Sequence, residues 1–294
     1  MDTYKKYIKN LYISTTFYKD NSDLLDVLNL CKKNKINNLE LGSNHKFSLN
    51  YLKYCKKFKF NYLTHNYFPP AKKNLIINLA SNNLKIRKKS IAHIKKCILF
   101  SKKIKSKLYT FHPGFVHDPL SQNKNSKSYD FVWKKKNNYK DKIQAFTNAI
   151  FSINEIISFA KANRVKIAIE TEGSISKKDF LIMQEPREFE VFYKIFRKKE
   201  IGINLNIGHL NLASKAFNFS KENFIKKFKN KISCMEFSHN NGKQDQHKAI
   251  KKNQWYSKYI FDRELIGIPK VLEYRDTKIA DIKKNLETIK KKRK

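Results

Sequence analysis

Short apolar stretches alternate with longer amphipathic stretches along most of this chain. Eight of the short stretches have the length and nearly continuous apolar character of strands buried on both faces. Such an alternating order is typical of a parallel sheet covered by helices. The pattern therefore predicts an α/β fold, a single (β/α)₈ TIM barrel domain spanning residues 1–294. The predicted strands cover residues 11–17, 37–43, 60–66, 107–114, 166–172, 202–209, 232–239 and 270–276.

The stretches between the strands have apolar residues at helical spacing. Stripes with three- and four-residue steps run through residues 91–98 and 143–157, and residues 21–22 are the predicted N-cap of an earlier helix. Two connections are longer than the others, at residues 115–140 and 240–268. Long loops in compact domains are usually functional or disordered. Both follow strands, so both are expected on the barrel face that holds active sites.

Length and composition narrow the class of protein. The chain has 294 residues, of which 40% are hydrophobic, enough for a large core. It contains no apolar run of about 18 residues and no signal peptide, which predicts a cytoplasmic protein with no membrane partner. Its four cysteines are scattered, with no metal or redox spacing, and are interpreted as reduced, mostly buried thiols. They are Cys31, Cys55, Cys97 and Cys234.

The formal net charge of +38 raises the question of a nucleic-acid partner. The basic residues are spread along the whole chain, and only seven of the 63 are arginine. Arginine is the residue that recognises phosphate in a bidentate manner, so a lysine excess without clustering favours compositional drift over a dedicated surface. Nucleic acid stays open as a less favoured partner. With seven glycines the chain has neither a P-loop nor a dinucleotide-binding motif.

Imidazole, carboxylate and amide side chains gather at or just after the C-terminal ends of the predicted strands. These ends meet at one rim of a barrel, where imidazole and carboxylate together suit a divalent metal ion such as Zn, Mn, Mg or Co. Glu170 and Glu273 each end an apolar strand, where a carboxylate is costly unless it has a partner. The candidate residues are His65, His112, Glu170, Asn206, His209, His239, Asp245, His247 and Glu273.

Each residue alone also has a plainer interpretation. A single strand-end histidine is more often structural than a ligand, residues 112–114 are compatible with an ordinary turn, and residues 245–247 with a solvated loop. Three further histidines are interpreted in this way: His93 within a helix, and His45 and His117 in loops where they could at most contact substrate. The joint pattern at one rim is what favours a site.

Five segments carry a resemblance to a known family. The chain resembles the xylose isomerase-like TIM barrel superfamily, which includes sugar isomerases and epimerases and the endonuclease IV-type (AP endonuclease family 2) repair enzymes. The similarity covers about residues 11–276, and its last three segments, in this order, are fairly specific. The segments are FHPGF at 111–115, IAIETEG at 167–173, GINLNIGHLNLA at 202–213, FSHNNGKQDQH at 237–247 and VLEY at 271–274.

The resemblance implies one to three metal positions. One would use His65, His112 and Glu170, a central one Glu170, Asn206, His239 and Glu273, and a third His209, Asp245 and His247. The chain departs from the family pattern at Asn206, where the family usually has Asp. An amide oxygen can coordinate a metal but brings no charge, which puts three-metal occupancy in doubt.

Three functions remain open at this point. The first is a metal-dependent isomerase or epimerase of a carbohydrate, with Glu170 and Glu273 as catalytic acid–base residues beside a carbonyl. The second is an apurinic-site endonuclease, favoured by the metal ligands and the basic charge and disfavoured by Asn206. The third is a non-catalytic metal-binding barrel. The sequence identifies neither the sugar nor the metal, and it leaves open a homo-oligomer.

Overall fold

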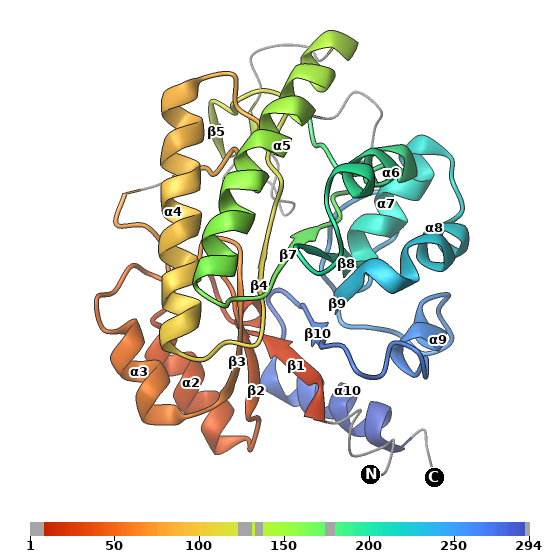
Figure 1. Cartoon of the computed structure of the whole chain (residues 1–294). Coiled ribbons are helices and arrows are strands. Elements are labelled where there is room, and N and C mark those ends of the chain that lie inside the picture. The colour runs from red at the N-terminus through yellow and green to blue at the C-terminus, as the bar shows by residue number, and fades with distance from the viewer. Residues whose placement is uncertain (1–8, 74, 123–130, 133–137, 174–179, 292–294) are drawn as a thin grey trace.

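A closed barrel of eight parallel strands forms the centre of the molecule, with helices around it (Figure 1). The computed structural model describes residues 9–73, 75–122, 131–132, 138–173 and 180–291. The strands follow one another in sequence order and the last pairs with the first, which confirms the predicted (β/α)₈ barrel. The barrel strands are β1 (Leu11–Ser14), β2 (Asn38–Leu41), β3 (Asn61–His65), β4 (Tyr109–Phe111), β7 (Ile167–Glu170), β8 (Gly202–Asn206), β9 (Ile232–Phe237) and β10 (Lys270–Leu272).

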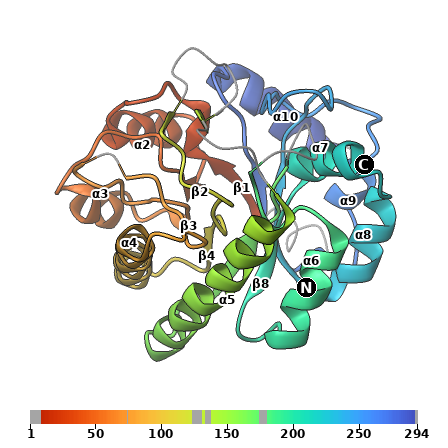
Figure 2. The ribbon, with the colours of Figure 1, turned by 90° about the horizontal axis from the view of Figure 1, so that it is seen from above.

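The helices form a ring outside these strands, as the view from above shows (Figure 2). Both predicted stripes are helices, namely α4 and α5, but α2 is capped by Asp23, whose side chain accepts from the Leu25 backbone N–H, and not by residues 21–22. The helices are α2 (Leu24–Lys33), α3 (Tyr51–Phe58), α4 (Leu84–Lys103), α5 (Tyr139–Ala162), α6 (Pro186–Ile195), α7 (Ile207–Phe217), α8 (Lys221–Phe228), α9 (Ser257–Ile260) and α10 (Ile279–Lys291), with 3₁₀ turns η1 (Thr15–Phe17) and η2 (Lys229–Lys231).

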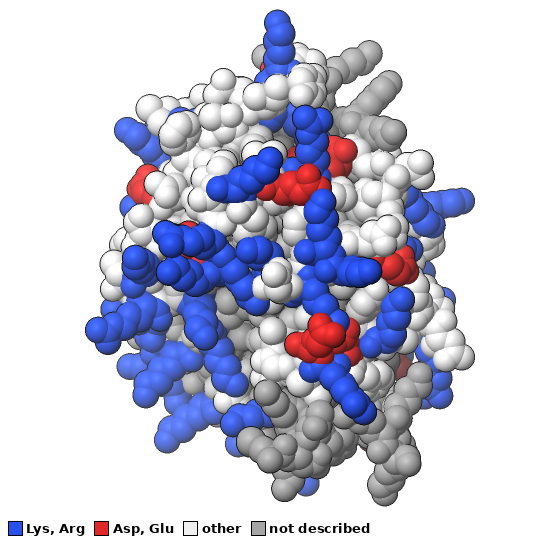
Figure 3. All heavy atoms as spheres, turned by 45° about the vertical axis from the view of Figure 1, so that its right-hand side comes forward, with Lys and Arg blue, Asp and Glu red and all other residues white. Residues whose placement is uncertain are grey.

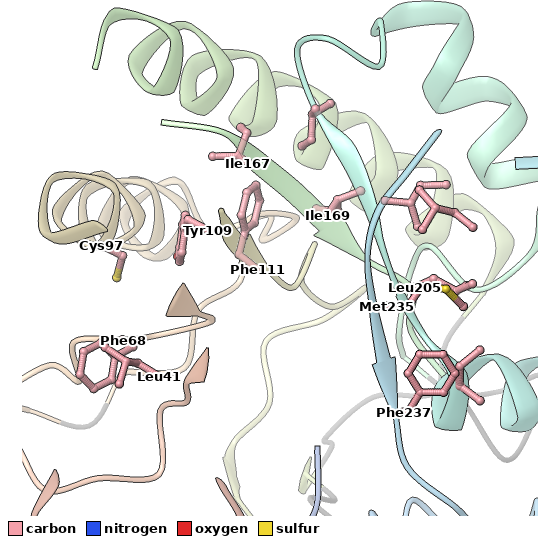
Figure 4. Packing of buried hydrophobic residues seen from close by; sticks show 14 of the residues in the cluster. Leu41, Phe68, Cys97, Tyr109, Phe111, Ile167, Ile169, Leu205, Met235 and Phe237 are labelled. Carbon is pink, nitrogen blue, oxygen red and sulfur yellow. The ribbon is translucent and has the colours of Figure 1, made fainter. Parts of the chain in front are cut away.

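Two apolar layers result from the alternation of side chains along the strands. Alternate residues face the helices and join the main core; Tyr109, Ile169 and Met235 lie between strands and helices in this layer (Figure 4). The residues between them face the barrel interior and form a separate small cluster. That cluster consists of Tyr12, Leu63, Leu108, Ala168, Cys234 and Val271.

The loops after the strands differ from the predicted pattern in three places. The predicted strand 202–209 ends at Asn206, and α7 begins at the next residue with no loop between them. The connection 115–140 contains a small antiparallel pair, β5 (Ser121–Gln122) and β6 (Phe131–Val132), while its residues 123–130 and 133–137 lie outside the described part of the chain. The connection 240–268 contains α9. The strand-to-helix junction at Asn206 determines much of the site geometry.

Other expectations from composition can be compared with the structure. All four cysteines are buried and free, as expected. Within the described residues, no helix combines the length and apolar character that crossing a membrane requires. Lysines and arginines spread over the face seen in Figure 3, with acidic side chains among them. On this face the charge is not gathered into one uninterrupted basic patch.

Candidate metal and acid–base site

The barrel interior changes from apolar to polar toward the C-terminal ends of the strands. Each residue of the interior apolar cluster is followed, two residues later along the chain, by a buried polar side chain. His65 on β3 and Glu236 on β9 come within 3.7 Å, although their strands are not neighbours, so both side chains point into the interior. The buried polar residues at this end include Ser14, Glu40, His65, Thr110, Glu170, Asn204, Asn206, Glu236 and Glu273.

A first group of side chains that could hold a metal ion, here called cluster A, consists of His65, His112 and Glu170. The Nε2 atoms of the two histidines lie 3.5 and 3.6 Å from Oε2 of Glu170. The opposite ring nitrogens are held by other residues: Nδ1 of His65 lies 2.8 Å from Oγ1 of Thr110, and Nδ1 of His112 lies 2.5 Å from Oε1 of Glu172. Such outer partners fix the ring orientation of metal-binding histidines.

Cluster A meets a simple test of fit for a divalent metal ion. Oε2 of Glu170 is buried and accepts no hydrogen bond from the described residues, although two imidazole nitrogens face it. A buried carboxylate oxygen without a partner is costly. A cation placed among two imidazoles and one carboxylate would supply that partner, and this donor set suits zinc and related ions.

A second set, cluster B, consists of His209, Asp245 and His247. The Nε2 atoms of the histidines lie 3.5 and 2.8 Å from Oδ2 of Asp245. Nδ1 of His209 faces the Thr171 carbonyl oxygen at 2.9 Å, and Nδ1 of His247 lies 3.1 Å from Glu273. Oδ1 of Asp245 has no hydrogen-bond partner among the described residues. As in cluster A, two imidazole nitrogens face one carboxylate oxygen, but here that oxygen, Oδ2, is already at hydrogen-bond distance from His247. The donor set of cluster B also fits a divalent ion.

The centre of the mouth, between the two clusters, is occupied by the amide of Asn206. Its Nδ2 lies 3.0 Å from carboxylate oxygens of Glu170, Glu236 and Glu273. Its Oδ1 accepts a hydrogen bond from the His209 backbone N–H at 3.1 Å, which makes Asn206 the N-cap of α7. Glu170 and Glu273, from the C-terminal ends of β7 and β10, thus face the same point.

The structure does not bring His239 into this centre, although the resemblance implied it as a central ligand. Its ring nitrogen Nδ1 lies 3.3 Å from the Tyr256 hydroxyl, and its backbone pairs with Lys248. The residue near the end of β9 that shares the Asn206 amide with Glu170 and Glu273 is Glu236. Side chains alternate along β9, so Glu236 faces the barrel interior like Cys234 two residues before it. This alternation is the sequence signal that could have identified Glu236.

Glu40, Glu172 and Glu236 were all missed as members of the site. Glu40 and Glu236 each lie between two apolar residues of a buried strand. A carboxylate in such a position is the signal that identified Glu170, and it would also have identified these two. Glu40, Glu236 and His65 have atoms within 4.8 Å of one another, and neither oxygen of Glu40 has a hydrogen-bond partner among the described residues.

The crowding of carboxylates separates their proton affinities. Burial, followed by repulsion from Glu273, raises the pKa of Glu40 to about 8. Burial, followed by repulsion from Glu170, raises the pKa of Glu236 well above its ordinary value. For Glu170 and Glu273 burial acts in the same direction, but facing histidines outweigh it and lower both pKa values, to about 2 for Glu273. Glu40 and Glu236 therefore hold a proton more tightly than Glu170 and Glu273 do.

The same carboxylates also shift the pKa values of the neighbouring histidines. Burial alone would lower the pKa of His112, but Glu170 and Glu172 outweigh burial and raise it to about 9. Burial would also lower the pKa of His209, but Asp245 and Glu170 outweigh it and raise the pKa well above its ordinary value. Both rings therefore hold a proton more tightly than an ordinary imidazole, and a metal ion bound to them would have to displace it.

Comparison with known proteins identifies what this chain is similar to. The family described as Xylose isomerase-like TIM barrel matches residues 45–292. The uncharacterized protein MJ1614 of Methanocaldococcus jannaschii is 26% identical over 215 residues, which are 73% of this chain and 72% of that protein.

Solved structures share the fold over nearly the whole chain. A D-tagatose 3-epimerase-like protein has a TM-score of 0.69 and 18% identity, covering 96% of this chain and 99% of that one. A D-psicose 3-epimerase studied in the presence of D-fructose has a TM-score of 0.64 and 12% identity, covering 95% and 96%. At these identities the likeness extends to the fold alone.

Proposed function

The chain belongs to the xylose isomerase-like TIM barrel family, and from this premise we propose that it is a metal-dependent isomerase or epimerase of a sugar or sugar phosphate. The proposed reaction moves a proton at a carbon next to a carbonyl group. One protein of similar fold is an epimerase studied with a ketose, which supports a substrate of this class. Family membership alone does not fix a reaction, so the proposal depends on the site.

The observation that carries the proposal is the convergence of Glu170 and Glu273 on one point. Both accept a hydrogen bond from the same Asn206 amide nitrogen at 3.0 Å, so their oxygens lie within twice that distance of each other. They come from the ends of β7 and β10, which are separated in the barrel by two strands. Two carboxylates held this close together, and carried by strands on different sides of the mouth, suit removal of a substrate proton by one and return of a proton by the other.

Clusters A and B would hold the metal. A bound divalent ion would supply polarisation of the carbonyl and hydroxyl oxygens of a substrate. His65 and His112 would hold it together with Glu170 in cluster A, and the three residues of cluster B would hold one there. The side chains of Thr110 and Glu172 keep the cluster A rings oriented for this purpose.

Solvent exchange tests the proposed reaction. Metal-loaded protein would be incubated in deuterated water with ketoses, aldoses and their phosphates, and proton NMR would follow loss of the signal next to the carbonyl. We expect deuterium incorporation with at least one member of the panel, accompanied by the isomer or epimer. No exchange across a broad panel by protein with filled metal sites would contradict the proposal.

A second candidate, hydrolysis of a phosphodiester at abasic sites in DNA, is favoured by cluster B. Proton transfer beside a carbonyl needs a single metal position, whereas two neighbouring metals suit an in-line phosphoryl displacement. The lysine excess adds general attraction for DNA. Incision of a duplex with one abasic site, without sugar exchange, would favour this function over the first.

A further inference from the structure

Asn206 stands at the junction where a barrel strand becomes a helix without a loop. It is the last residue of β8 and the N-cap of α7, with φ −83° and ψ 113°. Its side-chain oxygen accepts the His209 backbone N–H at 3.1 Å, satisfying one of the amide groups that a helix leaves unpaired at its start. The only oxygen of this side chain therefore points toward the first turn of the helix.

The other end of the amide faces the carboxylates as a consequence. Nδ2 lies 3.0 Å from one oxygen each of Glu170, Glu236 and Glu273. Turning the amide over would place its NH₂ group against the His209 N–H and its oxygen against three carboxylates, so that every contact would become repulsive. Asn206 is also fully buried, and water cannot compensate for a reversed orientation.

This orientation matters because an amide NH₂ group cannot bind a cation. A carboxylate at position 206 has two oxygens, and it could cap α7 with one and offer the other to a metal. An amide has one oxygen and one nitrogen without a free lone pair for a metal. The family resemblance implies a metal among Glu170, residue 206 and Glu273, but the residues of this chain do not fit it.

The set formed by Glu40, His65 and Glu236 does not provide a separate position either. Both oxygens of Glu236 already accept amide hydrogen bonds, at 2.7 Å from Asn204 and 3.0 Å from Asn206. The ring nitrogen of His65 that lies nearer to Glu236 is Nδ1, which faces the Thr110 hydroxyl at 2.8 Å. His65 is therefore oriented to serve cluster A through its other nitrogen.

We propose that the centre of the barrel mouth is closed to metal ions, and that the Asn206 amide takes the position of the central ion. Asn206 is then a positioning residue: it holds three carboxylates together and restricts divalent ions to clusters A and B. Among the described residues, the mouth of the wild-type protein then has at most two metal positions. This inference concerns metal occupancy and does not depend on which reaction the protein catalyses.

The test counts metal ions in wild type and two variants. Asn206→Asp keeps the helix cap and adds a charged oxygen, while Asn206→Ser keeps a capping oxygen but adds no charge. Each protein would be loaded with zinc, passed through a desalting column and measured by mass spectrometry of metals. We expect no more than two ions in wild type and one additional ion in Asn206→Asp. Asn206→Ser, which removes the amide nitrogen from the three carboxylates but adds no charged oxygen, should also bind the additional ion, more weakly than Asn206→Asp.

Variants that lack clusters A and B test the central position alone. In a background carrying His112→Ala and His247→Ala, the protein that keeps Asn206 should retain no zinc, and the protein that also carries Asn206→Asp should retain one ion. Three ions in wild type, or an equal count in wild type and Asn206→Asp, would overturn the proposal. Circular dichroism and a thermal melt would show whether each variant is folded.

A measurement on the wild-type protein covers the case in which the variants do not fold. Cadmium-113 NMR of protein titrated with Cd²⁺ reports one signal for each bound ion. Two signals or fewer at saturation agree with a closed centre. A third signal from an ion bound in the mouth would overturn it.

Discussion

Gly173 provides a way to disturb cluster B without changing any of its ligands. This glycine follows the acidic residues at the end of β7 and packs directly against the backbone of His209. A Cβ atom at position 173 would lie 2.5 Å from both Cα and the carbonyl oxygen of His209. Because these neighbours are backbone atoms, they cannot rotate away, and the Gly173→Ala protein must separate the two segments.

The size of the displacement follows from these distances. Ordinary carbon contacts begin at 3.4 Å, so the backbones must move apart by about 1 Å. Metal sites tolerate errors of only about 0.2 Å in ligand distance. Loss of supporting contacts around a metal site typically costs about 10–100-fold in affinity, which corresponds to about 1.4–2.8 kcal/mol. We expect a loss of this size at cluster B and little change at cluster A, apart from any small shift transmitted through Glu170.

The assay is competition for zinc with a chromophoric chelator, which resolves two sites of different affinity. Gly202→Ala is the matched control, because its Cβ would meet the Ser233 side chain at the other end of β8, away from both clusters. The control should lower the melting temperature but leave both zinc affinities unchanged. If Gly173→Ala remains folded and binds two zinc ions as tightly as wild type, the inference from backbone contact is refuted.

Three further predictions address pH, ligand orientation and charge. Burial lowers the pKa of His45 to about 4. As pH falls, the unfolded chain, in which this pKa is near 6.5, takes up a proton before the folded protein does, so the free energy of unfolding should fall by about 2 kcal/mol between pH 7 and pH 5 because of His45. Urea denaturation of His45→Gln at the two pH values should not show this part of the loss. Glu172→Gln removes the carboxylate 2.5 Å from Nδ1 of His112 and should weaken zinc binding at cluster A by about 10–100-fold in the same chelator assay, with cluster B unchanged. Affinity for duplex DNA should be weak, about 10⁻⁴–10⁻⁶ M at physiological salt, and equal for intact and abasic duplexes in a fluorescence anisotropy titration; tight, abasic-specific binding would point to the nuclease.

The barrel could be predicted from the sequence because burial imposes a simple pattern on it. All eight predicted strands are present, and their C-terminal ends meet at one rim, as parallel strands in a barrel must. Residue type and position were therefore sufficient to place clusters A and B on the same face. Glu236 was not predicted, because residue type alone favours the nearby His239, whereas the two-residue period of β9 turns Glu236 toward the interior.

The orientation of Asn206 could not be predicted because it depends on where a helix begins. The pattern GINLNIGH extends the apolar stretch to residue 209, and an uninterrupted strand would have left the Asn206 oxygen available. In the structure α7 starts at Ile207 and takes that oxygen for its first turn. A junction of this kind is decided by tertiary packing, which neither composition nor periodicity encodes.

Proton transfer by Glu170 and Glu273 is tested most directly by exchange of a substrate proton with deuterated water. Glu170→Gln and Glu273→Gln keep the side-chain shape but remove a basic oxygen, and Glu287→Gln, at an exposed position on α10, is the control. With a substrate that wild type exchanges, we predict a fall of about 10²–10⁴-fold in exchange rate for each of the two site variants and none for the control. Undiminished exchange by both folded, metal-loaded variants would contradict this assignment of the acid–base pair.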